Sequence, residues 1–203
     1  MRKYQIVAAI FSLCLVRAAC ADQIVSVSID AGSLNISNGG LDFQLNPGPL
    51  TTQSATLQIL NFSGASWTGT QQDIGSVSGG PLTTSPVTID NTFADNEDFE
   101  SFQFGKSVSF NLDFGGPAVT APNGASTSTT VFSLFLTDTT DASTYASGSI
   151  TVNLNGSLVW TSNSPEIHFA AATPEPGSLA LLIAACAIYG GFCLLRTRKR
   201  PLN

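Results

Sequence analysis

Basic residues are almost absent from the middle of this chain of 203 residues. Between Asp22 and Thr173 the only Lys or Arg is Lys106, whereas thirteen Asp and Glu residues give the same stretch a formal charge of −12. Nucleic-acid-binding domains carry a basic surface, and anionic membranes attract basic segments. The composition therefore argues against nucleic acid as a partner and against a domain that lies on an anionic membrane.

Cysteine and histidine are equally scarce. The four cysteines lie near the two ends of the chain, at positions 14, 20, 186 and 193. The middle of the chain therefore has no disulfide, and the single histidine, His168, does not make a transition-metal cluster. A Ser-His-Asp triad would have to use His168, and no G-x-S-x-G elbow accompanies it. We therefore expect a protein that is not an enzyme.

Residues 1–21 have the three parts of a secretory signal peptide. A positive start is followed by an apolar run at residues 6–16 and by the small residues Ala19 and Ala21. The apolar run is too short to span a bilayer comfortably. We expect signal peptidase to cleave between Ala21 and Asp22.

Residues 173–200 form a second targeting segment. Pro174, Glu175 and Pro176 precede an uncharged stretch, residues 178–195. As a helix this stretch is about 27 Å long, enough to cross a thin bilayer. Four basic residues follow it: Arg196, Arg198, Lys199 and Arg200. Because positive charges mark the cytoplasmic side, the preceding domain is expected outside the cytoplasm.

This order of Pro-Glu-Pro, apolar helix and basic tail resembles the PEP-CTERM sorting signal of Gram-negative bacteria, a segment also labelled ice-binding protein C-terminal domain. The resemblance implies recognition by an exosortase, a membrane-embedded cysteine protease or transpeptidase. That enzyme would remove the helix near Pro174–Pro176 and pass the domain to the cell surface or to an exopolysaccharide matrix. The prolines would hold an extended segment at the membrane face, which a protease requires.

Two alternatives at the chain ends stay open. The N-terminal segment is also compatible with a lipoprotein signal in which Cys20 carries the lipid, although Arg17 stands where such signals usually have Leu. The Pro-Glu-Pro segment is also compatible with a rigid linker before a permanent membrane anchor.

Residues 22–172 alternate apolar and polar side chains with a period of two, between Gly, Pro and Asn residues. This pattern is typical of half-buried antiparallel strands. The clearest segments are 25–29, 41–45, 108–114, 132–137 and 150–154. Weaker ones are 55–62, 87–90, 99–104, 158–161 and 166–169. About ten short strands predict an all-β, antiparallel two-sheet sandwich of jelly-roll type, with a core rich in Phe43, Phe104, Phe110, Phe114, Phe132 and Phe135.

The acidic stretch at residues 90–100 is the strongest candidate for a metal site. Its hard oxygen donors are Asp90, Asp95, Glu97, Asp98 and Glu100. Ca²⁺ takes six to eight such oxygens, although the D-x-[DN]-x-[DN]-G pattern is missing and a solvated acidic loop explains the stretch as well. The segment Leu41–Gly48 separately resembles an L-D-F-Q-x-N-P-G segment found in some PEP-CTERM proteins, to which no activity is attached.

Carbohydrate is the ligand class that the aromatic residues suggest. Trp67 lies in a loop-like stretch, Gly64–Gly69, and exposed tryptophan rings stack on sugars in carbohydrate-binding sandwiches. As an alternative to a surface or matrix protein without a ligand of this kind, the domain is therefore a carbohydrate-binding module associated with exopolysaccharide. A glycosidase, which needs two carboxyl groups flanking a cleft, is a further alternative.

Overall fold

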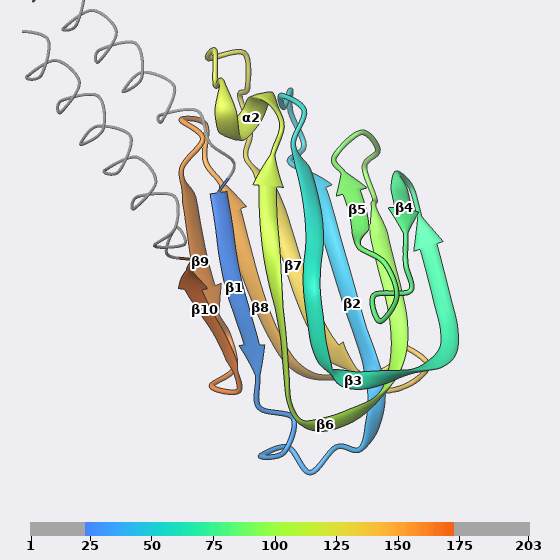
Figure 1. Cartoon of the computed structure of the whole chain (residues 1–203). Helices are drawn as coiled ribbons and strands as arrows, with labels where there is room; N and C mark the ends of the chain where they lie inside the picture. Colours follow the sequence, from blue (N-terminus) through green and yellow to red (C-terminus); the bar gives the residue numbers. More distant parts are fainter. Residues whose placement is uncertain (1–22, 173–203) are drawn as a thin grey trace, which may run out of the picture. The chain divides into compact units, whose positions relative to one another are not determined.

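The computed structural model describes residues 23–172, and this part of the chain is all-β (Figure 1). Its strands are β1 (Gln23–Ile29), β2 (Asn38–Pro47), β3 (Thr56–Ile74), β4 (Val77–Gly79), β5 (Val87–Asp90), β6 (Glu97–Gly115), β7 (Thr130–Thr137), β8 (Thr144–Val152), β9 (Leu158–Ser162) and β10 (Ile167–Ala171). A single helical turn, α2 (Pro117–Thr120), follows β6. Every strand pair is antiparallel, which confirms the predicted class.

The two longest strands, β3 and β6, organise the sheet. They pair with each other almost from end to end, from Thr56 opposite Gly115 to Ile74 opposite Glu97. The other edge of β6 is divided, because its first half pairs with β2 and its second half pairs with β1. The strand order β4-β5-β3-β6 therefore continues in two directions, through β2-β7-β8-β9 and through β1-β10.

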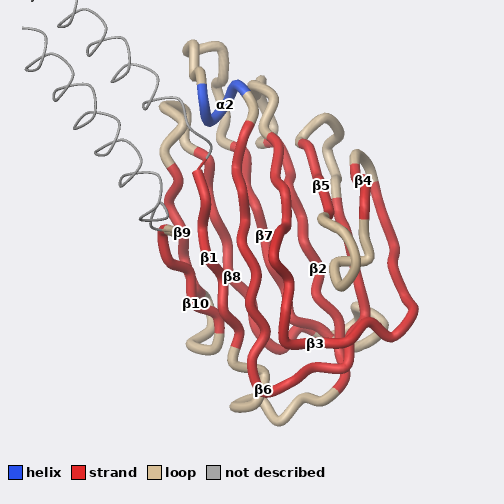
Figure 2. The backbone as a smooth tube through the Cα atoms, in the orientation of Figure 1, coloured by secondary structure: helices blue, strands red, loops and turns tan. Residues whose placement is uncertain are grey.

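Bending of β3 and β6 turns this branched sheet into two layers (Figures 1 and 2). One layer contains β4, β5, β1 and β10 with the first half of β3 and the second half of β6. The other contains β2, β7, β8 and β9 with the remaining halves. Strands that cross between sheets through bends or bulges form the corners of such sandwiches.

The bend of β3 contains two residues with left-handed backbone. Its register against β6 shifts between Leu60 and Ser63, and again between Ser63 and Ala65. Within this stretch Asn61 has φ 57° and Gly64 has φ 91°. A Cβ on Gly64 would lie 2.0 Å from the carbonyl oxygen of Ser107 on β6. Glycine therefore satisfies both the backbone angle and the close approach of the two strands.

Alternate side chains of both layers fill the space between them. The largest fully buried residues include Phe43, Phe102, Phe114, Phe132, Leu41, Leu57, Ile59 and Leu112. Phe43 meets Phe110 edge to face at 5.5 Å, and Phe114 meets Phe132 in the same way at 5.9 Å. Each such side chain contributes about 1.5–3 kcal/mol by leaving water. The core is thus the main stabilising feature of the sandwich.

The structure differs from the sequence prediction in several places. Residues 99–104 and 108–114, predicted as separate strands, belong to the continuous strand β6, whose pairing with β3 extends on both sides of its bend. Strand β8 begins at Thr144, well before the predicted 150–154, because small residues there hide the alternation; Gly148, for example, lies under the Phe169 ring. Phe135 is half-buried on the outer face opposite Asp42, because Leu134 and Leu136 occupy the inner positions.

Within residues 23–172, no helix has the length and hydrophobicity needed to cross a membrane. The predicted span, residues 178–195, lies outside the described part of the chain.

Replacing Gly64 with alanine is expected to destabilise the domain by about 2–4 kcal/mol. The left-handed backbone contributes about 1–2 kcal/mol, and the contact with Ser107 adds the cost of overpacking. Thermal and urea unfolding of the full chain measure the loss. Gly69→Ala is the matched control, because Gly69 has φ 103° but no atom lies within 4 Å of its added Cβ. Equal losses in the two variants would show that the contact with Ser107 has no effect.

Candidate functional site

The predicted acidic stretch does not form one site, because its residues lie on different faces. Asp90 ends β5 and accepts hydrogen bonds from the Ser76 hydroxyl at 2.6 Å and from the Thr92 amide at 2.9 Å. Asp95 is exposed in the loop before β6. Along β6 the side chains alternate, so Glu97 faces outward while Asp98 and Glu100 face the interior.

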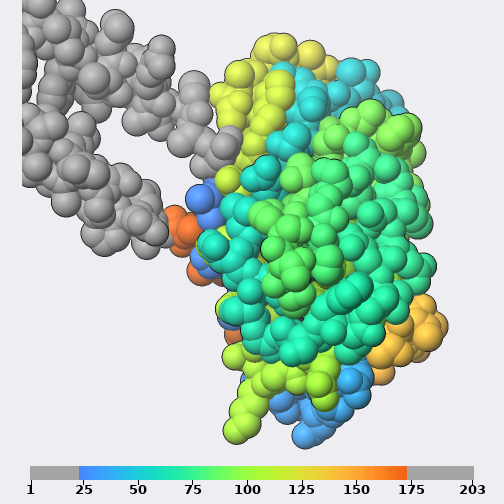
Figure 3. Space-filling model, turned by 45° about the vertical axis from the view of Figure 1, so that its right-hand side comes forward, coloured from blue at the N-terminus to red at the C-terminus, as the bar shows by residue number. Residues whose placement is uncertain are grey.

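Asp98 and Glu100 form an inner carboxyl pair that is fully buried. The backbone amide of Leu82 donates to both oxygens of Glu100, at 3.0 and 3.1 Å. The Gln71 amide donates to Asp98 at 3.1 Å and to Asp73 at 3.2 Å. In the space-filling view, the green segment around β4 and β5 lies on the face turned toward the viewer (Figure 3).

Burial raises the pKa values of both carboxyl groups of the inner pair well above the usual range. It raises the pKa of Asp98 to about 8, with the negative charges of Glu100 and Asp73 adding to the effect. Burial likewise raises the pKa of Glu100 to about 7, against the lowering effect of the Leu82 amide. Such enclosed groups are out of reach of a sugar, so this pair does not have the arrangement that a glycosidase requires.

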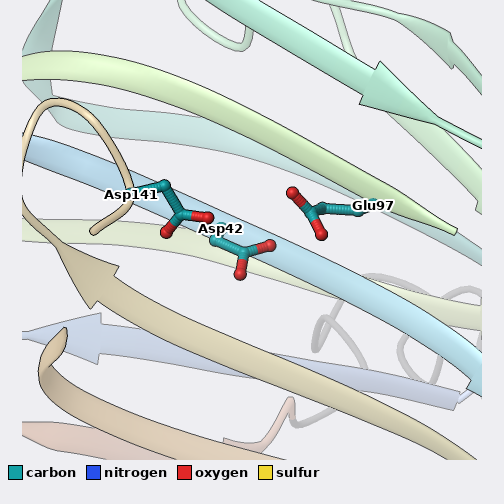
Figure 4. A group of neighbouring side chains, drawn as sticks. All are labelled: Asp42, Glu97 and Asp141. Atoms are coloured by element: carbon teal, nitrogen blue, oxygen red, sulfur yellow. The ribbon is translucent and has the colours of Figure 1, made fainter. Parts of the chain in front are cut away.

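Three other acidic residues, Asp42, Glu97 and Asp141, form what we call the outer carboxyl cluster. Asp42 lies on β2, Glu97 begins β6, and Asp141 belongs to the loop between β7 and β8. One carboxylate oxygen from each lies within 4.8 Å of the other two. Figure 4 shows the Asp42 carboxyl between the other two, with all three groups turned toward a common point.

Gln44 links two members of the outer carboxyl cluster. Its amide nitrogen donates to Oδ2 of Asp42 at 2.7 Å and to Oε2 of Glu97 at 3.3 Å. Asp42 is only 3% exposed, and its other oxygen, Oδ1, has no hydrogen-bond partner. Burial, followed by the charge of Glu97, raises the pKa of Asp42 to about 7. Burial and the charges of Asp141 and Asp95 also raise the pKa of Glu97.

Of the outer carboxyl cluster, the sequence prediction included only Glu97. Asp42 occupies a polar position in an alternating strand and Asp141 lies in an ordinary turn, so neither is conspicuous. They meet because β2 pairs with β6 on one edge and with β7 on the other. The one signal in the sequence is that Asp42 and Gln44 lie in the segment Leu41–Gly48 noted above for its resemblance.

The two tryptophans do not form one platform. Trp67 lies within strand β3 and not in a loop, so that part of the prediction was wrong. The residue is 42% exposed, and its indole N–H donates to the carbonyl oxygen of Thr70 at 3.2 Å. Trp160 is 37% exposed on β9, at the opposite edge of the layer. Five strand spacings, about 24 Å, separate these edges. Trp67 is therefore accessible, as expected, and lies far from Trp160.

His168 lies on the outer face of β10, beside a shallow groove of about 410 Å³. Ser28 and Ser109 are its neighbours across the strands. Ser109 shares a hydrogen bond with Ser63 at 2.9 Å, and Ser26 donates to Asn111 at 3.0 Å. Within residues 23–172, no hydrogen bond joins the His168 side chain to a serine or carboxylate, so no triad is assembled there.

The predicted processing residues lie outside the described part of the chain. They are Ala19, Ala21, Pro174, Glu175, Pro176, Arg196, Arg198, Lys199 and Arg200.

Comparisons with known proteins give no match. No family model matches the chain, and neither a curated protein nor a solved structure is similar enough to it to count as one. Function therefore has to be argued from the residues and their geometry.

The raised pKa values predict a domain that loses stability as pH rises from about 4 to about 8. Unfolded carboxyl groups release their protons near pH 4, whereas folded Asp98 and Glu100 hold theirs to about pH 8 and 7. Each group therefore lowers the free energy of unfolding as pH rises through the range in which only the folded state keeps the proton. Urea unfolding across this range, in buffer with EDTA, measures the slope.

Asp98→Asn is expected to make the free energy of unfolding less dependent on pH, because the variant lacks one of the two buried carboxyl groups. The control is Asp30→Asn, which changes an exposed carboxylate that accepts from the Ser33 amide and should leave the wild-type slope. A slope that stays the same in Asp98→Asn would mean that Asp98 is ionised in the folded domain.

Proposed function

We propose that this chain is an exported, non-enzymatic protein of the cell surface or extracellular matrix, delivered by its two terminal segments. The observation that carries the proposal is that every described strand lies between the two proposed processing sites. Strand β1 begins at Gln23, directly after the proposed signal peptidase site, and β10 ends at Ala171, just before Pro174. Cleavage at both proposed sites would leave every described strand whole.

The first and last described strands are also adjacent. Val25 near the start of β1 pairs with Ala171 at the end of β10. The two proposed processing sites therefore flank, in the sequence, two strands that pair with each other, which supports processing at both ends of one folded unit.

The proposed route has two processing steps and one membrane. Signal peptidase removes residues 1–21, and residues 178–195 hold the precursor in the inner membrane with residues 22–172 outside the cytoplasm. An exosortase then cleaves near Pro174–Pro176 and releases the domain to the surface or to an exopolysaccharide matrix of a Gram-negative bacterium. If no exosortase acts, the same helix is a permanent anchor.

We further propose that the antiparallel strands are arranged like a jelly roll. The pairs β1–β10, β2–β7, β3–β6 and β4–β5 nest inside one another along the chain, as in a long hairpin that is rolled up. The hairpin of β8 and β9 is an insertion between β7 and β10. Nested antiparallel pairs of this kind support the jelly-roll comparison.

Exopolysaccharide binding is the second candidate function, and the geometry of Trp67 favours it. The hydrogen bond to Thr70 holds the indole ring in one orientation while 42% of the residue stays exposed. A fixed and accessible ring loses little entropy when it stacks on a sugar.

The delivery proposal predicts the intact mass of the surface form in the native host. That form should begin at Asp22 and end near Pro176. In a host without the exosortase, or after replacing Pro174, Glu175 and Pro176 together with alanine, the chain should keep residues 178–203 and stay in the membrane fraction. Thr173→Ala is the control and should be processed normally. Retention of residues 178–203 in every sample would establish a permanent anchor.

The glycan proposal predicts that Trp67→Ala weakens binding to exopolysaccharide from the native host by about tenfold, which corresponds to about 1.4 kcal/mol of lost stacking. Affinity electrophoresis of the full chain measures this effect. Trp160→Ala is the matched control, because Trp160 has similar exposure at the opposite edge. Wild-type mobility that is unaffected by the polysaccharide would refute the proposal.

A further inference from the structure

The outer carboxyl cluster concentrates negative charge from three separate parts of the chain. Asp42, Glu97 and Asp141 bring one oxygen each to within 4.8 Å of the others. Asp95 lies near enough for its charge to act on both Asp42 and Glu97. The only Lys or Arg of the described residues is Lys106, which lies farther along β6, in its bend. No basic side chain of residues 23–172 is thus placed to balance this charge.

One oxygen of the cluster lacks any partner, which is a separate observation from the clustering. Oδ1 of Asp42 is buried and accepts no hydrogen bond, whereas Oδ2 accepts one from Gln44. Leaving a buried carboxylate oxygen unpaired is costly. In Figure 4 the Asp42 carboxyl lies between those of Asp141 and Glu97. The unpaired oxygen and the convergence of the three groups indicate that the cluster is completed by a positively charged ligand.

We infer that Asp42, Glu97 and Asp141 bind a Ca²⁺ ion. The donor set is made of carboxylate oxygens only, which suits Ca²⁺ and Mg²⁺ and does not suit metals that prefer nitrogen or sulfur. Ca²⁺ holds its ligands at about 2.3–2.6 Å, so oxygens on opposite sides of the ion lie up to about 5 Å apart. All three oxygens of the cluster lie within that span of one another. Mg²⁺ demands near-octahedral ligands and gives up its water reluctantly, so three carboxylates from separate parts of the chain suit Ca²⁺ better.

The surroundings of the cluster orient these ligands. Gln44 donates to Asp42 and Glu97 on the side of their Oδ2 and Oε2 atoms. Asn46 donates to the Gln44 side-chain oxygen at 3.5 Å and accepts from the Asn96 amide at 2.7 Å, so the amide that joins the two carboxylates is itself anchored. Second-shell contacts of this kind set the direction of metal ligands.

The bound ion would tie an exposed loop to the sheet. Asp141 is the only one of the three ligands outside a strand, and it lies between β7 and β8. Its exposure leaves the remaining coordination positions to water. A site with three carboxylates and several waters is expected to bind Ca²⁺ with a Kd of about 10⁻⁴–10⁻³ M, as extracellular modules do. The inference concerns the folded domain and does not depend on how the chain is exported.

The first test is thermal unfolding of the full chain after EDTA treatment and dialysis. A CaCl₂ concentration of about 10 mM exceeds a Kd of 10⁻³ M about tenfold. Binding then increases the equilibrium constant for folding by a factor of about 11. For a domain of this size the Tm should rise by about 3–6 °C. NaCl of equal ionic strength should give no comparable rise, and MgCl₂ a smaller one. An equal rise in NaCl would show that salt screening alone acts, and the inference would be wrong.

The second test locates the ion. Asp141→Asn is the main variant, because asparagine tolerates the left-handed backbone of Asp141, φ 58°, and the position is exposed. It should weaken Ca²⁺ binding at least tenfold in isothermal titration, where the wild-type chain should bind one ion. Asp42→Asn should abolish the Tm rise without lowering the Tm in EDTA. Asp30→Asn, the control, should behave as the wild type. Wild-type Ca²⁺ affinity in Asp141→Asn would place the ion elsewhere and overturn the inference.

Discussion

The continuous pairing of β3 with β6 is the constraint on which the rest of this domain depends. Because the two strands stay paired on both sides of their bends, each contributes half its length to each layer. All other strands attach to one half or the other, through β1, β2 or β5. The enclosed core, the covered inner carboxyl pair and the divided acidic stretch all follow from this shared pair.

A domain with so many acids and one lysine has few ion pairs available, and it uses other means to accommodate carboxyl groups. Asp98 and Glu100 are kept protonated by burial and receive hydrogen bonds from Gln71 and Leu82. Asp138 is exposed and accepts bonds from the Thr140 and Ala142 amides. The inner pair and the outer carboxyl cluster each keep one buried oxygen without a partner, Oδ2 of Asp98 and Oδ1 of Asp42. The cluster is the better candidate for a ligand because three carboxyl groups converge there and Asp141 is exposed.

The sequence predicts the class of fold well because alternation with a period of two directly reflects one buried face. The sequence predicts β6 poorly. Gly105, Lys106 and Ser107 interrupt the alternation of apolar and polar side chains, although the strand continues and pairs with β3 on both sides of these residues. Within the acidic stretch the sequence cannot separate Glu97 from Asp98, because neighbouring residues of a strand point to opposite faces. Asp42 and Asp141 come together only through strand register, which is a property of the folded sheet and not of any local pattern.

The scarcity of basic residues has a consequence for proteolysis. Proteases of the trypsin type cut after Lys or Arg, and residues 23–172 offer them only Lys106, which is exposed in the bend of β6. A cut there divides the strand between the half that pairs with β2 and the half that pairs with β1. The two fragments would still hold each other through the ladder that β3 forms with both halves. Such a nicked domain is a non-covalent complex, and the single lysine marks the point where one layer passes into the other.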